Sequence, residues 1–146
     1  MVTQFCTFNV GNLLFGVDVV LVQEVMRYQE MTRVPLASPM IRGIINLRGQ
    51  LVTAVDMRRR LGLPEASEGT LPMNVIVRRE DDAISLLVDE IGDVIDVSAE
   101  ALERPPETLM GTARELIKAV CQLEGALLLV LDAQQITSVA DTERAA

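Results

Sequence analysis

The sequence of 146 residues contains no histidine, and aromatic residues make up only 3% of it. Without histidine the chain lacks the commonest general base, the commonest neutral metal ligand and any histidine phosphoacceptor of its own. Only two cysteines are present, Cys6 and Cys121, and both lie inside apolar stretches. We expect them to be buried thiols that act as small hydrophobic residues.

Basic residues are also scarce, with 13 lysines and arginines against 21 acidic residues and a net charge of −8. An acidic chain without a basic patch is a poor candidate for binding nucleic acid or an anionic membrane surface. No basic N-terminal segment precedes a long apolar run, and the apolar run Ala126–Leu131 is too short to cross a bilayer. We therefore expect a cytoplasmic protein without membrane insertion. Because 49% of the residues are hydrophobic, the length suits one folded domain, or two small subdomains sharing a core.

An internal repeat is the main feature that the sequence does contain. Residues 41–60 align without a gap to residues 117–136, and weaker similarities precede both segments. We interpret 1–146 as a single domain of two pseudo-repeated subdomains, roughly 5–61 and 74–137, joined by a connector at 62–73 that is rich in glycine and proline. The equivalent residues Leu51 and Leu127 are expected on buried strands.

Short runs of β-branched and aliphatic residues between turn residues predict four β-hairpins. The paired segments are Gln4–Val10 with Leu13–Val17, Ile44–Leu47 with Leu51–Val55, Val75–Arg79 with Ala83–Val88, and Ala119–Leu123 with Ala126–Leu131. Two repeats of two hairpins predict a mostly β fold of two small antiparallel barrels.

Helices are expected to be few and short. Asp56 and Asp132 are predicted to cap helices at Met57–Leu61 and Ala133–Val139, and Ser38-Pro39 to begin another. The segment Asp18–Met26 is ambiguous, because its apolar residues fit one helical stripe although valines favour strands. We favour a helix there.

Most charged side chains have an ordinary interpretation. Glu24 and Asp93 occupy equivalent places in the two repeats, but no nucleophile accompanies them, so we expect exposed acids rather than a catalytic pair. The run Arg58–Arg60 is interpreted as a solvated helix face. Arg48 differs, because it occupies a turn between two apolar strands where the other repeat has Glu124. The turn itself does not demand arginine, and a guanidinium can pair bidentately with a carboxylate, which favours a binding role.

Several segments together resemble a known family. They are Phe15–Asp18, Val22–Val25, Arg33–Pro35, Pro39–Gly49, Val55–Arg58, Val88-Asp89, Ile91–Val94, Arg104–Pro106 and Leu128–Asp132. In this order they resemble the CheW family of coupling proteins in bacterial chemotaxis. The run Gly43-Ile44-Ile45-Asn46-Leu47-Arg48-Gly49 is the most specific segment, and the resemblance covers nearly the whole chain.

The resemblance implies two five-stranded SH3-like barrels packed together and a non-catalytic adaptor without a cofactor. Such a protein joins the cytoplasmic tips of chemoreceptors to the regulatory domain of a CheA-type histidine kinase. The positions that match the family's receptor groove between the barrels are Val22, Glu24, Arg42, Gly43, Arg48 and Val75. The positions that match its kinase surface are Met31 and Val34.

Three alternatives remain open at this point. The chain is alternatively a CheW-like adaptor of another chemosensory pathway, such as pilus motility or a non-motile output. A structural or ligand-binding barrel that contacts other proteins is a second alternative. An enzyme is the third, and the lack of histidine and of a carboxylate cluster disfavours it.

Overall fold

The structure is a computed structural model that describes residues 1–109 and 111–136. Its strands are β1 (Val2–Val10), β2 (Leu13–Asp18), β3 (Val22–Met26), β4 (Ile41–Leu47), β5 (Gln50–Asp56), β6 (Met73–Arg78), β7 (Ala83–Val88), β8 (Glu90–Ser98), β9 (Ile117–Leu123) and β10 (Ala126–Leu131). Two short helices, α1 (Met57–Arg60) and α2 (Thr112–Leu116), and two 3₁₀ turns, η1 (Val19–Leu21) and η2 (Ala99–Ala101), complete these elements. The predicted mostly β class and all four predicted hairpins are confirmed.

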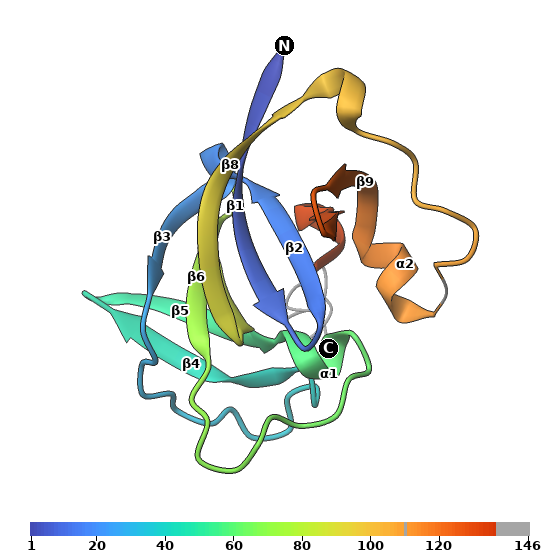
Figure 1. Ribbon diagram of the computed structural model, residues 1–146. Coiled ribbons are helices and arrows are strands. Elements are labelled where there is room, and N and C mark those ends of the chain that lie inside the picture. The colour runs from blue at the N-terminus through green and yellow to red at the C-terminus, as the bar shows by residue number, and fades with distance from the viewer. Residues whose placement is uncertain (110, 137–146) are drawn as a thin grey trace.

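The strands form two five-stranded sheets (Figure 1). Sheet 1 has the order β8-β1-β2-β10-β9, and sheet 2 has the order β3-β6-β7-β5-β4. Neighbouring strands are antiparallel except at one place in each sheet, where β2 pairs with β10 and β5 pairs with β7 in parallel. The sheets are thus antiparallel, as predicted, apart from these two pairings.

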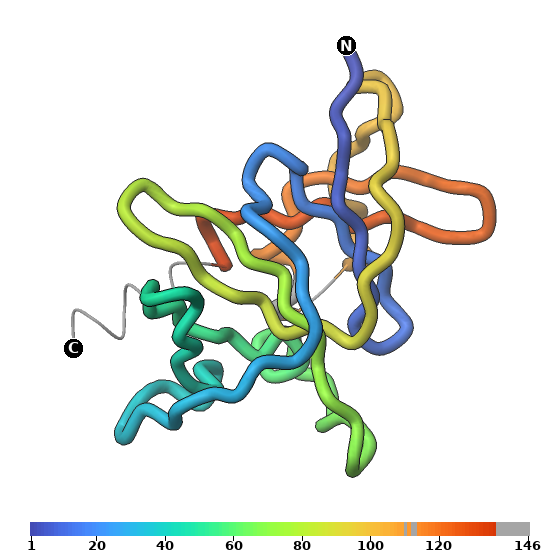
Figure 2. The backbone as a smooth tube through the Cα atoms, turned by 90° about the vertical axis from the view of Figure 1, so that its left-hand side faces the viewer, coloured from blue at the N-terminus to red at the C-terminus, as the bar shows by residue number. Residues whose placement is uncertain are grey.

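Each sheet combines strands from both sequence repeats. Sheet 1 contains the hairpin β1–β2 of the first repeat and β8, β9 and β10 of the second, while sheet 2 contains the reciprocal set. Figure 2 shows this exchange, since the N-terminal β1 runs beside β8 from the middle of the chain. The ranges 5–61 and 74–137 thus do not each form a sheet of their own. The repeat describes the pseudo-symmetry of the strands, and pairing across the repeats joins the halves.

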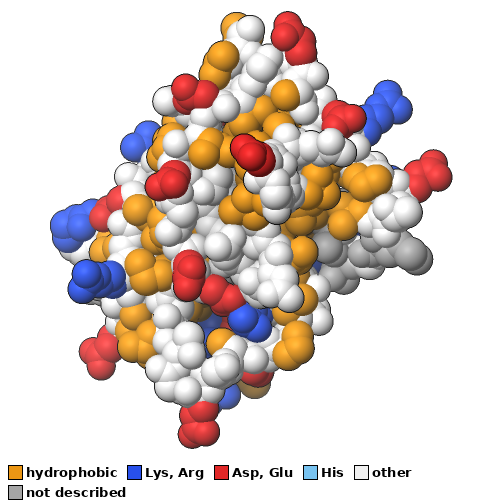
Figure 3. Space-filling model, in the orientation of Figure 1, with side chains coloured by type: hydrophobic (Ala, Val, Ile, Leu, Met, Phe, Trp, Pro, Cys, Tyr) orange, Lys and Arg blue, Asp and Glu red, His pale blue; other side chains and the backbone are white. Residues whose placement is uncertain are grey.

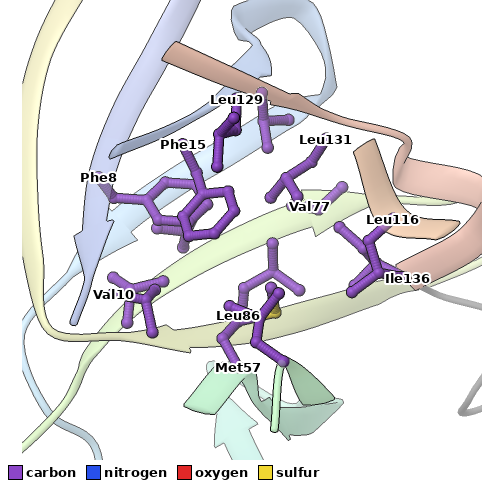
Figure 4. Packing of buried hydrophobic residues seen from close by; sticks show 14 of the residues in the cluster. Phe8, Val10, Phe15, Met57, Val77, Leu86, Leu116, Leu129, Leu131 and Ile136 are labelled. Atoms are coloured by element: carbon purple, nitrogen blue, oxygen red, sulfur yellow. The ribbon is translucent and has the colours of Figure 1, made fainter. Parts of the chain in front are cut away.

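One large hydrophobic core lies between the two sheets (Figure 4). Phe8 and Phe15 from sheet 1 stack with ring centroids 5.9 Å apart. They belong to one buried cluster with Val77 and Leu86 from sheet 2 and with Met57 at the start of α1. Because both sheets bury residues in the same cluster, separating them would expose that cluster to water at a large cost.

Asp56 and Asp132 cap the turns that follow β5 and β10, as the sequence predicts. Asp56 accepts a hydrogen bond from the backbone N–H of Arg59 at the start of α1. Asp132 accepts from the backbone N–H of Gln134, and residues 133–136 are helical. The rest of the predicted helix Ala133–Val139 lies outside the described residues.

Two other helix predictions are wrong. Only the three residues of η1 follow Asp18 as a 3₁₀ turn, and the valines after it form β3 as an edge strand of sheet 2. Ser38-Pro39 begins a turn rather than a helix, because β4 starts at Ile41 and draws the chain into sheet 2. In the described residues, no helix is long and apolar enough to cross a membrane.

The prediction that Leu51 and Leu127 are buried is also wrong. Leu51 is 64% exposed and Leu127 is 40% exposed. Both lie near the tips of hairpins that project beyond the core, at the start of β5 and β10. The next residues of the same strands, Val52 and Leu128, are fully buried. In both strands the first two residues are exposed and burial begins at the third, so Leu51 and Leu127 are exposed because they lie at the hairpin ends.

Candidate functional site

An ion pair joins two of the predicted receptor-binding residues on sheet 2. Arg48 Nη2 donates a hydrogen bond to Glu24 Oε2. Glu24 lies on β3, which is an edge strand, and Arg48 lies in the β4–β5 turn. The hydrogen bond from Arg48 is the main cause that lowers the pKa of Glu24. Because the Arg48 side chain is 68% exposed, a partner can reach this pair directly.

The backbone of the β4–β5 turn holds Arg48 in an unusual conformation. Arg48 has φ of 53° and Gly49 has φ of 90°, and Asn46 Oδ1 accepts a hydrogen bond from the Gly49 N–H. Two successive positive φ values are typical of the tightest hairpin turns. Among the described residues only Leu36 and Arg48 adopt a positive φ without being glycine. The turn therefore keeps an arginine where Asn or Gly would be less strained, which supports a role outside folding.

Arg42 and Gly43 lie at the opposite end of β4 from Arg48. Six residues of a strand span roughly 20 Å, so these positions belong to a separate surface. Arg42 Nη1 donates to Asp56 Oδ2 at 3.1 Å. Gly43 is buried, and a Cβ built there would lie 2.7 Å from the backbone oxygen of Thr32. Gly43 thus permits the close approach of the loop between β3 and β4 and presents no side chain to a partner.

The two valines of the predicted groove differ from that prediction. Val75 is fully buried in the central strand β6, so its side chain contacts the core rather than a partner. Val22 is only partly buried and packs against the edge of the same core. The exposed apolar residues close to the Glu24–Arg48 pair in the sequence are instead Val25, at 41% exposure, and Leu51. Of the predicted receptor-binding residues, the structure therefore brings Glu24 and Arg48 into contact.

The predicted kinase residues Met31 and Val34 both line a pocket of about 770 Å³. We call it the loop pocket, because residues 28–39 of the loop between β3 and β4 form most of its wall. Arg42 lies in this wall as well, and Arg59 and Glu65 close the other side. One pocket thus contains candidates from both predicted surfaces.

Sequence reasoning missed the structural part played by the arginines of α1. Arg58 binds Asp89 through two hydrogen bonds of 2.9 and 2.7 Å. Arg59 donates to Glu65 at 3.0 Å and to the carbonyl oxygen of Pro39 at 2.9 Å. The prediction of a solvated helix face is therefore wrong for these two arginines. Because α1 is only one turn long, its arginines reach segments on several sides, and no local sequence signal marks those partners.

Among residues 1–109 and 111–136, no group of three or more His, Cys, Asp or Glu side chains could hold a metal ion. Cys6 and Cys121 are free and buried, as predicted, and burial raises the pKa of the Cys6 thiol. Hydrophobic side chains also reach the surface. Figure 3 shows hydrophobic side chains gathered in the upper half of the face that it draws, around the region of β9, with acidic side chains among them. Exposed apolar patches of this kind mark protein–protein contacts.

The fold is that of a mostly β protein with two five-stranded sheets, and comparison with known proteins identifies the family. A family model described as a CheW-like domain matches residues 4–141. The chain is 31% identical to the chemotaxis protein CheW of Treponema pallidum over 98% of this chain and 86% of that one. It is 32% identical to the chemotaxis protein CheW of Bacillus subtilis over 91% of this chain and 85% of that one.

The fold agrees with this result. The crystal structure of the scaffolding protein TtCheW from Thermoanaerobacter tengcongensis superposes with a TM-score of 0.82, at 23% identity and over 90% of both chains. The chain belongs to the CheW family.

Proposed function

We propose that this chain couples the cytoplasmic tips of chemoreceptors to the regulatory domain of a CheA-type histidine kinase. Membership of the CheW family over nearly the whole chain is the observation that carries this proposal, and it makes the chain a chemotaxis coupling adaptor. The adaptor acts by holding partners in fixed positions and not by catalysis. Its place is the cytoplasm, where the receptor tips lie.

The receptor surface lies at the β3 edge of sheet 2. The Glu24–Arg48 pair provides charges of both signs there, and Leu51, three residues after Arg48, provides an exposed apolar contact. An amphipathic receptor helix fits such a surface, because its apolar stripe covers the aliphatic side chains while charged residues meet the ion pair. Charges at the edge of an interface mainly set specificity and association rate, and the apolar centre supplies most of the affinity.

The kinase surface lies at the other end of β4, around the loop pocket. Met31 and Val34 line this pocket, and so does Arg42, which the family resemblance assigned to the receptor groove. Gly43 keeps the loop against β4, so its effect on either partner is indirect. Val75 on β6 lies opposite Val25 on the neighbouring strand β3, so the buried Val75 helps to hold β3 in place. Two surfaces at opposite ends of one strand give the adaptor a fixed spacing between its partners.

The test is a charge reversal at Arg48 with a matched control at the equivalent position. Arg48→Glu places a second acid beside Glu24 and is expected to weaken receptor binding by about 2–5 kcal/mol if the contact is desolvated. Its thermal midpoint is expected to change little, because an ion pair with a largely exposed arginine contributes at most about 1 kcal/mol. The control Glu124→Arg changes the repeat-equivalent position in the β9–β10 turn of sheet 1, where Glu124 does not have the positive φ of Arg48, and is expected to leave receptor binding intact.

Titration calorimetry of both variants, with a receptor-tip fragment and with the kinase regulatory domain, separates the possible outcomes. The wild-type chain is expected to bind both partners without nucleotide or metal. Absence of any binding at about 100 μM, roughly −5.5 kcal/mol, contradicts the coupling function. Equal loss of receptor binding in both variants contradicts only the assignment of Arg48.

A further inference from the structure

The loop pocket concentrates positive charge in an acidic protein. Arg33, Arg42 and Arg59 line it together with one acid, Glu65, although the whole chain has a net charge of −8. Arginines gathered at a concave surface form a site for carboxylates, because each planar guanidinium can bind one through two parallel hydrogen bonds.

Two of the three arginines are fixed in place while keeping donors free. Arg42 uses Nη1 to bind Asp56, which is 5% exposed, and Arg59 is held by Glu65 and the backbone of Pro39. A guanidinium has five N–H donors, so both retain further donors for a ligand. Arg33 makes no ion pair or side-chain hydrogen bond within the described part of the chain, and it is exposed. The pocket is therefore a preorganised cationic site with unused capacity.

The rim of the pocket carries an apolar side chain in a strained position. Leu36 is fully exposed at 102% and has φ of 63°, a region that residues with a Cβ rarely adopt. Pro35 and Pro39 restrict the loop on both sides of it. Strained residues of this kind occur at ligand-binding loops, where the surrounding chain fixes them. A small anion in the pocket would leave Leu36 in water, whereas a ligand with its own apolar group would cover it.

We propose that the loop pocket binds an acidic segment of a partner protein in which carboxylates flank a large apolar side chain. The carboxylates pair with Arg33 and with the free donors of Arg42 and Arg59, and the apolar side chain packs on Leu36 and Met31. The volume of about 770 Å³ lies within the range of ligand pockets. This proposal depends on the proposed function in one respect, which is that Met31 and Val34 belong to a partner-binding surface.

The experiment uses the ¹⁵N-labelled full chain and two blocked hexapeptides as probes. One has the sequence Leu-Glu-Asp-Leu-Glu-Asp, and in the other lysine replaces every acid. The acidic peptide is expected to give saturable shifts of backbone amides within residues 28–42 at about 1 mM or below. The lysine peptide is expected to give none.

Three variants assign the contacts. Arg33→Glu is expected to weaken binding of the acidic peptide at least about ten-fold. Leu36→Asn removes the apolar contact while keeping a residue that tolerates a positive φ, so reduced binding is not a folding effect. The control Arg78→Glu changes an exposed arginine outside the pocket and is expected to have no effect.

Several results overturn the proposal. They are absence of shifts with the acidic peptide, equal shifts with the lysine peptide, and equal weakening by Arg33→Glu and Arg78→Glu. If free citrate binds as tightly as the peptide and Leu36→Asn has no effect, the pocket is a small-anion site and the proposal is wrong. If the acidic peptide does not bind but the chain still binds kinase and receptor, the proposal for the loop pocket is wrong and the proposed coupling function is not affected.

Discussion

Replacement of Asp89 by asparagine tests how the two sheets are held together. Asp89 lies between β7 of sheet 2 and β8 of sheet 1. Arg58, which follows β5 of sheet 2, donates Nε and Nη2 to its two carboxylate oxygens at 2.9 and 2.7 Å. The backbone N–H of Gly11, in the β1–β2 turn of sheet 1, donates to Oδ2 at 2.7 Å. One carboxylate thus binds donors from both sheets.

The size of the effect follows from the charge and shielding of these contacts. Hydrogen bonds to charged groups contribute about 1.5–3 kcal/mol each. Asparagine keeps one acceptor oxygen but loses the charge and the bidentate geometry with Arg58. Because Arg58 and Asp89 are only 22% and 23% exposed, solvent screens the pair only in part. We expect Asp89→Asn to lower the free energy of unfolding by about 2–3 kcal/mol at neutral pH.

The same contact predicts the pH dependence of stability. The hydrogen bond from Arg58 is the main cause that lowers the pKa of Asp89 in the folded chain. A carboxyl group with a lowered folded pKa stabilises the fold fully above its unfolded pKa, about 3.9 for aspartate. That stabilisation is lost as the pH falls through the folded pKa. The difference between wild type and Asp89→Asn is therefore expected to be constant near neutral pH and to shrink as the solution becomes strongly acidic.

Urea unfolding of both proteins across this pH range measures the difference, and Asp18→Asn is the matched control. Asp18 is the repeat equivalent of Asp89, but within the described residues its side chain accepts only the Val20 N–H, at 3.1 Å. Asparagine caps a turn about as well as aspartate, so the control is expected to cost only a few tenths of a kcal/mol. Equal losses in the two variants, or a difference for Asp89→Asn that persists in strong acid, would refute the proposed tie between the sheets.

Two further substitutions test the packing. Gly43→Ala places a Cβ 2.7 Å from the Thr32 oxygen, so calorimetry is expected to show a loss of about 1–3 kcal/mol, and an unchanged melting curve would contradict the close approach. Leu129→Ala truncates a side chain that is 3% exposed in the central core and is expected to cost about 2–5 kcal/mol in urea unfolding, whereas Leu127→Ala is expected to cost within about 0.5 kcal/mol. Equal losses at the two leucines would contradict the described difference in burial between the start of β10 and its middle.

The strands could be predicted from the sequence where apolar runs met clear turns. All eight segments assigned to hairpins are strands in the structure. The two strands that were missed, β3 and β8, are edge strands whose pairing shifts register at a bulge. In β8 the shift falls between Ile91 and Val94, and it interrupts the alternation that reveals a strand in sequence. The exchange of hairpins between the repeats could not be predicted, because equivalent strands present the same apolar pattern to either partner.

The candidate site was predictable only where the sequence contrasted the two repeats. Arg48 was identified because its equivalent, Glu124, has the opposite charge, and the structure places it in an exposed ion pair with Glu24. Val75 could not be told apart from an exposed valine, because burial on both faces of β6 depends on strands distant in sequence. The hydrogen bonds of Arg58 and Arg59 were missed for a similar reason, because no sequence pattern in the loops that accept them predicts a contact with α1.

We propose that the chain holds receptor and kinase at the same time, at opposite ends of β4. Sedimentation velocity of the adaptor with a receptor-tip fragment and the kinase regulatory domain measures this directly. We expect a ternary complex for the wild-type chain. With Arg48→Glu we expect only the complex of adaptor and kinase domain. If the kinase domain instead displaces the receptor fragment from the wild-type chain, the two partners share one surface, and the proposal of separate surfaces at opposite ends of β4 is wrong.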